Sequence, residues 1–353
     1  MPAIKNFRGL LLLPLTLLAG CNTLLLNASG DIARQQGHLI LVSTVLMLLI
    51  IVPVLVLTVL FAWRYRRANK EADFSPDWDH STELELAIWA APLLIIIALG
   101  AVTWISTHTL DPYRPLRRLA VNRPVPAEIK PLEVEVVALD WKWLFIYPEQ
   151  GIAVVNELAA PVDRPIVFRI TASSVMNSFF IPALAGQIYA MPGMETKLNA
   201  VINAPGDFEG FSANYSGAGF SDMRFRFHGV SDADFDAWVQ KAKSGGGELT
   251  RAGYLEMVKP SEREPVRRFG AVAPDLYDAI LNRCVERDKM CMKQMMAIDA
   301  HGGMGKMGAY NLSSRRTPGR SDLPGFGYVT ALCSAEEPAG PSTISLSTPR
   351  IRD

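Results

Sequence analysis

The sequence predicts a membrane α-helical hairpin (two transmembrane helices) followed by an all-β sandwich and a short helical C-terminal extension. Three observations predict it. Residues 39–62 and 86–106 are long apolar runs without a charge, residues 130–230 contain a series of short strand-like segments, and residues 231–302 return to helical patterns. The formal net charge of the 353-residue chain is zero, and no basic patch suggests a nucleic-acid partner. We therefore expect a membrane protein with one exported domain.

Residues 1–20 have the pattern of a secretory signal peptide. Two basic residues precede the apolar run LLLPLTLLAG, which is too short to span a bilayer. Cys21 directly follows LAG, and small residues before a cysteine resemble the lipobox of bacterial lipoproteins, in which that cysteine receives the lipid. A plain signal peptide with an incidental cysteine is the alternative. We expect lipid attachment at Cys21 and an exported N-terminal segment over residues 21–37.

Residues 38–107 are predicted to form the hairpin. The 24-residue run over 39–62 covers the ~30 Å hydrocarbon core of a bilayer, because a helix rises about 1.5 Å per residue. The loop before the second span begins with WRYRRANK, whose four positive charges place it on the cytoplasmic side by the positive-inside rule. Everything from about Thr107 onward is then expected outside the cytoplasm.

Short segments rich in Val, Ile, Phe and Tyr follow, separated by turn residues. This spacing predicts a sandwich or barrel of about 100 residues. Trp141 and Trp143 are expected on one face of a single strand, where they pack rather than carry electrons. The predicted strands are 132–140, 142–147, 165–171, 186–190 and 196–202, together with the GDFEG and RFRFH stretches.

Helical patterns resume after the sandwich. Ser231, followed by acidic residues, predicts a helix N-cap, and further helices are expected near 251–258 and over 275–300. Beyond residue 302 the sequence is mainly Gly, Pro, Ser, Thr and Arg with little periodicity, so a disordered tail is expected over 303–353.

Three cysteines remain for the exported part of the chain. Cys284 and Cys291 would share the last predicted helix, about two turns apart, so a disulfide between them would require that helix to break. The pairing among these two and Cys333 stays open at this point.

Three segments resemble subunit II of the haem–copper terminal oxidases: ALDWKWLFIYP, NSFFIP with GQIYAMPG, and ANYSGAGFSDM. The resemblance covers roughly residues 38–230, and residues 234–290 resemble the aromatic-containing tail of quinol-oxidising members. It implies a cupredoxin-like periplasmic domain over 130–230 in a bacterial inner-membrane protein. It also implies a haem-bearing subunit I and further membrane subunits as partners.

The resemblance includes the positions at which members that accept electrons from cytochrome c bind a two-copper centre. Those members use His, Cys and Met side chains there, because soft ligands suit copper. The residues of this sequence supply no thiolate and no imidazole, which implies a domain that lacks copper. Gly217 and Gly219 would keep the loop in shape. The copper-ligand positions of the family are occupied here by Asn177, Asn214, Ala218, Asp222 and Phe225.

The resemblance is therefore to the quinol-oxidising branch, the cytochrome bo-type ubiquinol oxidases. It implies a proton-translocating complex that oxidises ubiquinol and reduces dioxygen to water. The haems and the catalytic copper would be in subunit I, so this chain would hold no cofactor and no catalytic residue. Two alternatives remain, a cytochrome c oxidase subunit II with a two-copper centre and a non-respiratory membrane lipoprotein that acts as a binding module.

Glu85 is the candidate for a role in proton entry. It lies at the predicted cytoplasmic start of the second span, in a segment that matches the family segment whose Glu marks the entrance of a proton channel. An ionisable group at a membrane boundary is suited to collecting protons. The alternative is an interfacial carboxylate that only ends the span.

Overall fold

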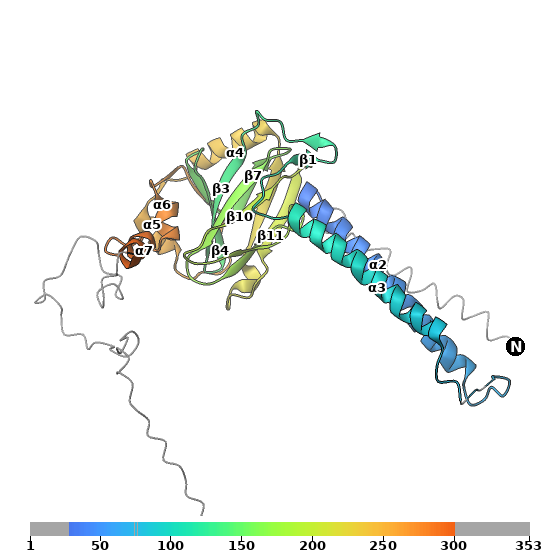
Figure 1. The fold of residues 1–353 in the computed structure, drawn as a ribbon. Helices are drawn as coiled ribbons and strands as arrows, with labels where there is room; N and C mark the ends of the chain where they lie inside the picture. The colour runs from blue at the N-terminus through green and yellow to red at the C-terminus, as the bar shows by residue number, and fades with distance from the viewer. Residues whose placement is uncertain (1–27, 74, 76, 301–353) are drawn as a thin grey trace, which may run out of the picture. The chain divides into compact units, whose positions relative to one another are not determined.

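The computed structural model describes residues 28–73, 75 and 77–300. The predictions for the signal peptide, for Cys21, for Cys333 and for the tail lie outside these residues. Two long helices come first, α2 (Asp31–Arg64) and α3 (Thr82–Thr109), and they run side by side (Figure 1). Both are long and apolar enough to cross a membrane. The prediction of two helices of membrane-spanning length and composition is therefore confirmed.

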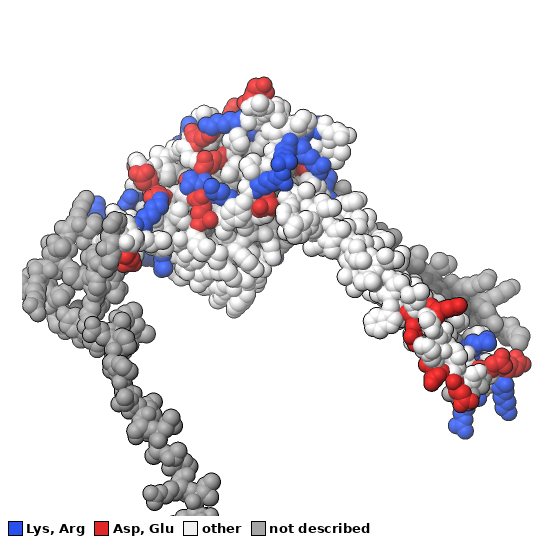
Figure 2. Space-filling model, in the orientation of Figure 1, with Lys and Arg blue, Asp and Glu red and all other residues white. Residues whose placement is uncertain are grey.

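The surface of the hairpin is apolar along its middle. Figure 2 shows Lys, Arg, Asp and Glu near its loop and on the sandwich, with none on the visible surface between them. Ile95 is the only residue of α3 that is buried, whereas large side chains such as Leu60 and Ile97 are exposed. A surface of this kind is stable when lipid or the helices of a partner cover it.

The start of α2 is attached to the sandwich. The Gly30 N–H donates a hydrogen bond to the carbonyl of Ala183 at 2.8 Å, and the Asp31 carboxylate accepts one from Nε of Arg118 at 2.9 Å. A Cβ atom on Gly30 would lie 2.4 Å from the Leu184 carbonyl oxygen, so this contact requires glycine. Helix α2 therefore begins at Asp31, eight residues before the predicted span, and residues 31–37 belong to it.

Two sheets face each other to form the sandwich. The six-stranded sheet has the order β10-β7-β3-β4-β5-β14 and the five-stranded sheet has the order β6-β12-β11-β8-β9. The first contains β3 (Leu132–Leu139), β4 (Lys142–Tyr147), β5 (Ile152–Val155), β7 (Ile166–Ala172), β10 (Thr196–Ala200) and β14 (Arg267–Phe269). The second contains β6 (Glu157–Pro161), β8 (Asn177–Phe180), β9 (Ile188–Ala190), β11 (Gly206–Ser212) and β12 (Arg224–Val230).

Within the two sheets of the sandwich, most strands pair antiparallel, with two parallel exceptions. Strand β3 pairs parallel with β7, with Val136 opposite Ile170, and β12 pairs parallel with β6, with Phe227 opposite Leu158. Two small sheets lie outside the sandwich, formed by β1 (Arg118–Ala120) with β2 (Arg123–Pro124) and by β13 (Glu248–Leu249) with β15 (Ala271–Val272).

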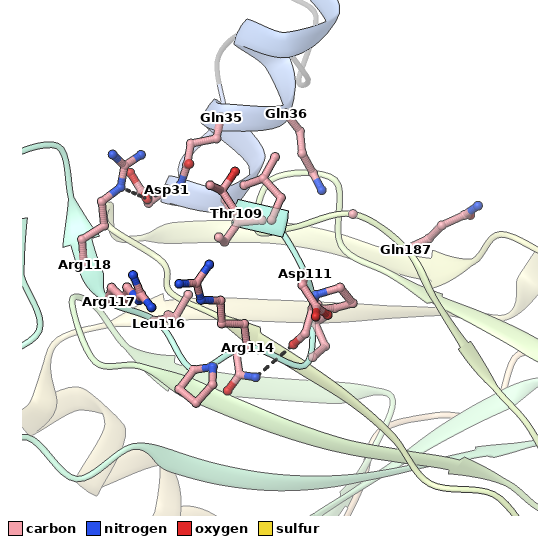
Figure 3. Close-up of a pocket in the computed structure, with 17 residues that line it drawn as sticks. Asp31, Gln35, Gln36, Thr109, Asp111, Arg114, Leu116, Arg117, Arg118 and Gln187 are labelled. Carbon is pink, nitrogen blue, oxygen red and sulfur yellow. Dashed lines mark hydrogen bonds and ion pairs between the residues drawn. The ribbon is translucent and has the colours of Figure 1, made fainter. Parts of the chain in front are cut away.

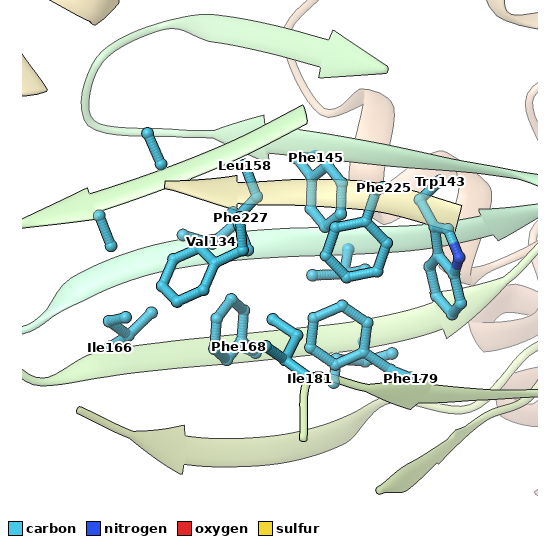
Figure 4. Packing of buried hydrophobic residues seen from close by; sticks show 14 of the residues in the cluster. Val134, Trp143, Phe145, Leu158, Ile166, Phe168, Phe179, Ile181, Phe225 and Phe227 are labelled. Atoms are coloured by element: carbon cyan, nitrogen blue, oxygen red, sulfur yellow. The ribbon is translucent and has the colours of Figure 1, made fainter. Parts of the chain in front are cut away.

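An aromatic cluster fills the space between the sheets (Figure 4). Phe179 and Phe225 stack with ring centroids 5.5 Å apart, and Trp143 packs edge-on against Phe179 at 5.3 Å. All three side chains are buried. Trp143 thus packs in the core, as the sequence predicted. Trp141 does not share its strand, because β4 begins at Lys142 and Trp141 has a φ of 65° in the turn before it; the same-strand prediction is wrong.

The C-terminal extension contains helices, and it adds one strand to the six-stranded sheet. Helix α4 (Asp232–Ser244) begins after Ser231, whose hydroxyl accepts a hydrogen bond from the Asp234 N–H, as predicted. Helix α5 (Arg251–Met257) follows, and then β14 joins the sandwich beside β5, with Arg268 opposite Val154. The extension therefore completes the six-stranded sheet.

The single helix predicted over 275–300 is wrong. Helix α6 (Leu276–Leu281) ends where Arg283 takes a left-handed φ of 57°, a conformation that a continuing helix cannot contain. Helix α7 (Met292–Ala300) belongs to a separate unit that begins at Glu286. Cys284 and Cys291 are both disulfide-bonded, and they do not share a helix, because α6 ends before Cys284 and α7 begins after Cys291.

Candidate functional site

The copper-ligand positions of the family lie at one end of the sandwich. Asn177 begins β8, and residues 214 and 218 lie in the loop that follows β11. Asp222 ends the short 3₁₀ helix η2 (Phe220–Asp222), and Phe225 lies in β12. Strands β8 and β12, which lie on either side of β11 in the five-stranded sheet, and the loop between β11 and β12 therefore supply these positions.

Hydrogen bonds occupy the polar atoms of this site. Asn177 is buried, and its Oδ1 accepts a hydrogen bond from the Ser212 hydroxyl at 3.1 Å. Its Nδ2 donates to the carbonyl of Val175 at 3.1 Å. The Asn214 side chain donates to the carbonyl of Met176 at 3.4 Å, which holds the loop against the start of β8. Because both the oxygen and the nitrogen of this buried amide are hydrogen-bonded within the protein, the side chain has a structural role.

Trp141 covers the loop from the six-stranded sheet. Its indole Nε1 donates a hydrogen bond to the Ser216 carbonyl at 3.1 Å. A Cβ atom would lie 3.0 Å from the indole ring at Gly217 and 2.6 Å from it at Gly219. Gly217 also has a φ of 117°, which favours glycine, whereas Gly219 has an ordinary φ of −85°. The glycines thus serve two purposes, a tight turn at Gly217 and close approach of the indole at both.

Asp222 is the only carboxylate among the copper-ligand positions. Its Oδ2 accepts a hydrogen bond from Nε of Arg263 at 3.0 Å in an ion pair. Phe225 contributes no donor atom, because its side chain is a hydrocarbon ring, and this ring packs against the core aromatics Phe145 and Phe179. The carboxylate therefore already has a cationic partner from the C-terminal extension.

The donor set does not fit a two-copper centre. Such a centre needs thiolate and imidazole ligands, whereas these positions offer amides, one ion-paired carboxylate and hydrocarbon. Over residues 28–73, 75 and 77–300, no group of three or more His, Cys, Asp or Glu side chains is arranged to hold a metal ion. We therefore derive no electron-transfer step through copper in this domain.

Glu85 lies at the opposite end of the hairpin from the sandwich, in the first turn of α3. Its Oε1 is 2.8 Å from Nδ1 of His80, and Nε2 of His80 is 3.2 Å from the Thr82 hydroxyl. The side chains of His80 and Glu85 are 63% and 53% exposed. Ser81 caps the helix by accepting a hydrogen bond from the Leu84 N–H. The arrangement is a solvent-accessible carboxylate and imidazole in direct contact, which can exchange a proton with each other and with water.

Four contributors to these sites were not recognised from the sequence. The sequence pattern assigns no role at these sites to His80, Ser212 or Arg263, and it places Trp141 on a strand. His80 could have been found, because it lies five residues before Glu85 and next to the helix cap. The partnership of Arg263 with Asp222 spans 41 residues and left no local signal.

Comparison with known proteins gives two family matches. The profile described as "Cytochrome C oxidase subunit II, periplasmic domain" matches residues 133–230. The profile described as "COX Aromatic Rich Motif" matches residues 243–288. The first match covers the sandwich, and the second covers most of the C-terminal extension.

Curated relatives match over most of the chain. Cytochrome bo(3) ubiquinol oxidase subunit 2 of Pseudomonas putida is 51% identical over 280 residues, which are 79% of this chain and 85% of the relative. Ubiquinol oxidase subunit 2 of Acetobacter aceti is 50% identical over 265 residues, 75% of this chain and 84% of the relative. Quinol oxidase subunit 2 of Bacillus subtilis (strain 168) is 37% identical over 263 residues, 73% of this chain and 79% of the relative. With this identity and coverage, the chain belongs to the family of ubiquinol oxidase subunit 2, a haem–copper oxidase subunit II.

Proposed function

We propose that this chain is subunit II of a proton-translocating ubiquinol oxidase that reduces dioxygen to water. The observation that carries the proposal is the high identity to ubiquinol oxidase subunit 2 proteins over most of the chain. The absence of soft ligands at the copper-ligand positions supports it. A soluble one-electron donor needs a metal centre at the surface, whereas a quinol delivers electrons from within the membrane. The haems and the catalytic copper would then be in subunit I.

The proposed orientation places the sandwich in the periplasm and the loop between α2 and α3 in the cytoplasm. The four Lys and Arg residues of WRYRRANK support this, because positive residues are retained on the cytoplasmic side. A lipid on Cys21 would add a second anchor on the periplasmic side. Replacement of Cys21 by Ala should abolish incorporation of labelled palmitate while the chain stays in the membrane; incorporation without Cys21 would contradict the proposed attachment site.

The sandwich would dock on subunit I through an exposed uncharged patch around the loop. Asn214 ties this loop to Met176, and β8 pairs with β9, so the segments that form the patch are neighbours. Exposed apolar clusters of this kind mark contact surfaces. The patch consists of Val175, Met176, Tyr189, Met194 and Tyr215, all exposed.

The test of the proposed function is purification of the complex through a tag on this chain in mild detergent. We expect a haem spectrum in the purified fraction and oxygen uptake with ubiquinol but not with reduced cytochrome c. Uptake with cytochrome c alone would instead favour a cytochrome c oxidase. A chain that purifies without a haem-bearing partner would favour a non-respiratory binding protein.

We further propose that Glu85 and His80 collect protons for the complex on the cytoplasmic side. The 2.8 Å contact between them and their exposure support this role. Glu83 offers a matched control, because it lies in the same helical turn but two residues away, so it points about 200° around the helix from Glu85.

The Glu85→Gln variant should lower the rate of quinol-driven proton uptake by on the order of tenfold, the lower end of what a focusing charge contributes. The Glu83→Gln variant should leave it unchanged. Proton uptake is measured with a pH indicator during turnover of the complex reconstituted in vesicles. Equal rates of proton uptake in the two variants would show that Glu85 is only an interfacial residue at the end of the helix.

A further inference from the structure

We infer that the periplasmic end of the hairpin binds a phospholipid with an anionic headgroup, held in two adjoining cavities where α2 and α3 meet the sandwich. The inference goes beyond the proposed oxidase activity and rests on the membrane orientation proposed with it. Three observations carry it: a polar cavity with excess positive charge, an apolar cavity next to it, and shared residues between the two.

The polar cavity has a volume of about 300 Å³ and is lined by the ends of both helices, by the segment after α3 and by the sandwich. Figure 3 shows Arg114, Arg117 and Arg118 on one side of it, with Gln36 and Gln187 on the other. Volumes of ~300–1,000 Å³ are typical of small-molecule sites.

The arginines of this cavity differ in whether an acidic side chain pairs with them. Arg118 is committed to Asp31 at 2.9 Å, and Gln35 donates to the same carboxylate oxygen of Asp31 at 2.7 Å. Arg114 donates a hydrogen bond to the carbonyl of His108 at 2.9 Å, which positions its guanidinium without neutralising it.

Of the three arginines, Arg117 has the fewest side-chain interactions. Its exposed side chain makes no ion pair and no side-chain hydrogen bond within residues 28–73, 75 and 77–300. Among the described residues that line the cavity, the acidic side chains are Asp31 and Asp111, so the three arginines give this lining a net charge of +1. A planar guanidinium fits the oxygens of a phosphate.

The second cavity has a volume of about 610 Å³ and extends along the hairpin. Its apolar lining includes Leu39 and Val42 from α2 and Val102 and Ile105 from α3, which belong to the two runs expected within the membrane. Its lining is mainly hydrocarbon, as an acyl chain requires.

The two cavities meet at the level where headgroups lie. Five residues line both: Asp31, Gln35, Thr109, Leu110 and Arg118. A ligand that fits both must carry a negative group joined to a hydrocarbon chain, and it must enter from the membrane. A free phosphate would fill only the first cavity, and an apolar helix of a partner would cover only the second. A phospholipid satisfies both.

The test uses the whole complex, purified in detergent and then offered phosphatidylglycerol or phosphatidylcholine. Retained lipid is counted by native mass spectrometry. The wild-type complex should retain phosphatidylglycerol in preference to phosphatidylcholine. The Arg117→Gln variant should lose this preference by about two- to fivefold, the range for one exposed charge pair, while it retains phosphatidylcholine normally. Arg251→Gln is the matched control, because Arg251 is an exposed arginine on α5, outside both cavities, and should change nothing.

A second variant tests the apolar cavity. Val42→Phe fills it and should lower retention of both lipids, whereas Val45→Phe, one turn away and outside the cavities, should not. The inference is overturned if Arg117→Gln keeps the headgroup preference, if Val42→Phe keeps both lipids, or if inorganic phosphate binds through Arg117 while no lipid is retained. Haem content and ubiquinol-driven oxygen uptake of the same samples separate this failure from failure of the proposed oxidase function.

Discussion

The interior of the sandwich and the loop at its end are held together by different kinds of contact. In the interior, Trp143, Phe179 and Phe225 are held by contact between buried rings. At the loop, Ser212 and Asn177 from the adjoining strands hydrogen-bond to each other, and Trp141 covers the backbone. Both regions are therefore held by contacts between groups of the protein itself. The core is held by contact between rings, whereas the loop is held by a few hydrogen bonds that join segments distant in sequence.

The largest effect is expected in the core. Phe179→Ala removes a ring that contacts Phe168, Trp143 and Phe225, and should lower the free energy of unfolding by about 3–5 kcal/mol. Denaturant unfolding of the purified chain in detergent, followed by tryptophan fluorescence, measures this. Ser212→Ala, at the end of β11 beside the loop, should lower the free energy of unfolding by about 1 kcal/mol. If the two variants lost equal stability, the distinction between core and loop would fail.

A smaller effect is expected where Trp141 meets the loop. Gly219→Ala places a methyl group 2.6 Å from the indole and should destabilise the chain by about 1–3 kcal/mol. Because the φ of Gly219 is ordinary, this cost is steric, so it should nearly vanish in a Trp141→Ala background. A double-mutant cycle measures the coupling. An undiminished cost in the double variant would mean that Trp141 does not determine the loop.

The outer face of the six-stranded sheet offers a third environment, in which a carboxylate is buried. Burial raises the pKa of Glu135 to about 7, although Arg169 lies 3.0 Å away and favours the charged form. The unfolded carboxyl titrates near 4.5, so between these values the folded state binds more protons than the unfolded state. The contribution of Glu135 to stability is therefore full below pH 4.5 and is lost as the pH rises through about 7.

This loss should amount to on the order of 3 kcal/mol. The Glu135→Gln variant should abolish it, which is measured by denaturant unfolding at pH 5 and pH 8. Glu133→Gln is the control, because Glu133 also contacts Arg169 but its side chain is 38% exposed. A pH slope in Glu135→Gln equal to that of the wild type would show that the titrating group lies elsewhere.

The sequence predicted the parts of the fold that depend on local pattern. The two apolar runs became α2 and α3, and the strand patterns over 132–140 and 142–147 became β3 and β4. Strands β5 and β6 were missed, because IAVV and ELAAP are short and do not alternate in polarity.

The remaining differences arise from backbone geometry and long-range contacts. The left-handed conformations of Trp141 and Arg283 were not predictable, since neither residue type favours a positive φ. The early start of α2 depends on the bridge from Gly30 to Ile202, far along the chain.

At the candidate site, the resemblance assigns residues to the copper-ligand positions, and the chemistry of those residues predicts a domain without copper. It did not reveal what those residues do instead. The contacts of Asp222 with Arg263 and of Trp141 with the loop join segments that are distant in sequence. The sequence shows the chemical type of the residue at each position, whereas only the three-dimensional structure shows which residues contact each other.

We propose that this polypeptide carries no copper and that electrons therefore reach the complex through quinol. The test is the metal content of the chain after separation from its partner subunits and exposure to copper, measured by elemental analysis together with electron paramagnetic resonance. We expect no stoichiometric copper and no two-copper signal. Stoichiometric copper that a reduced cytochrome c can reduce would contradict this proposal.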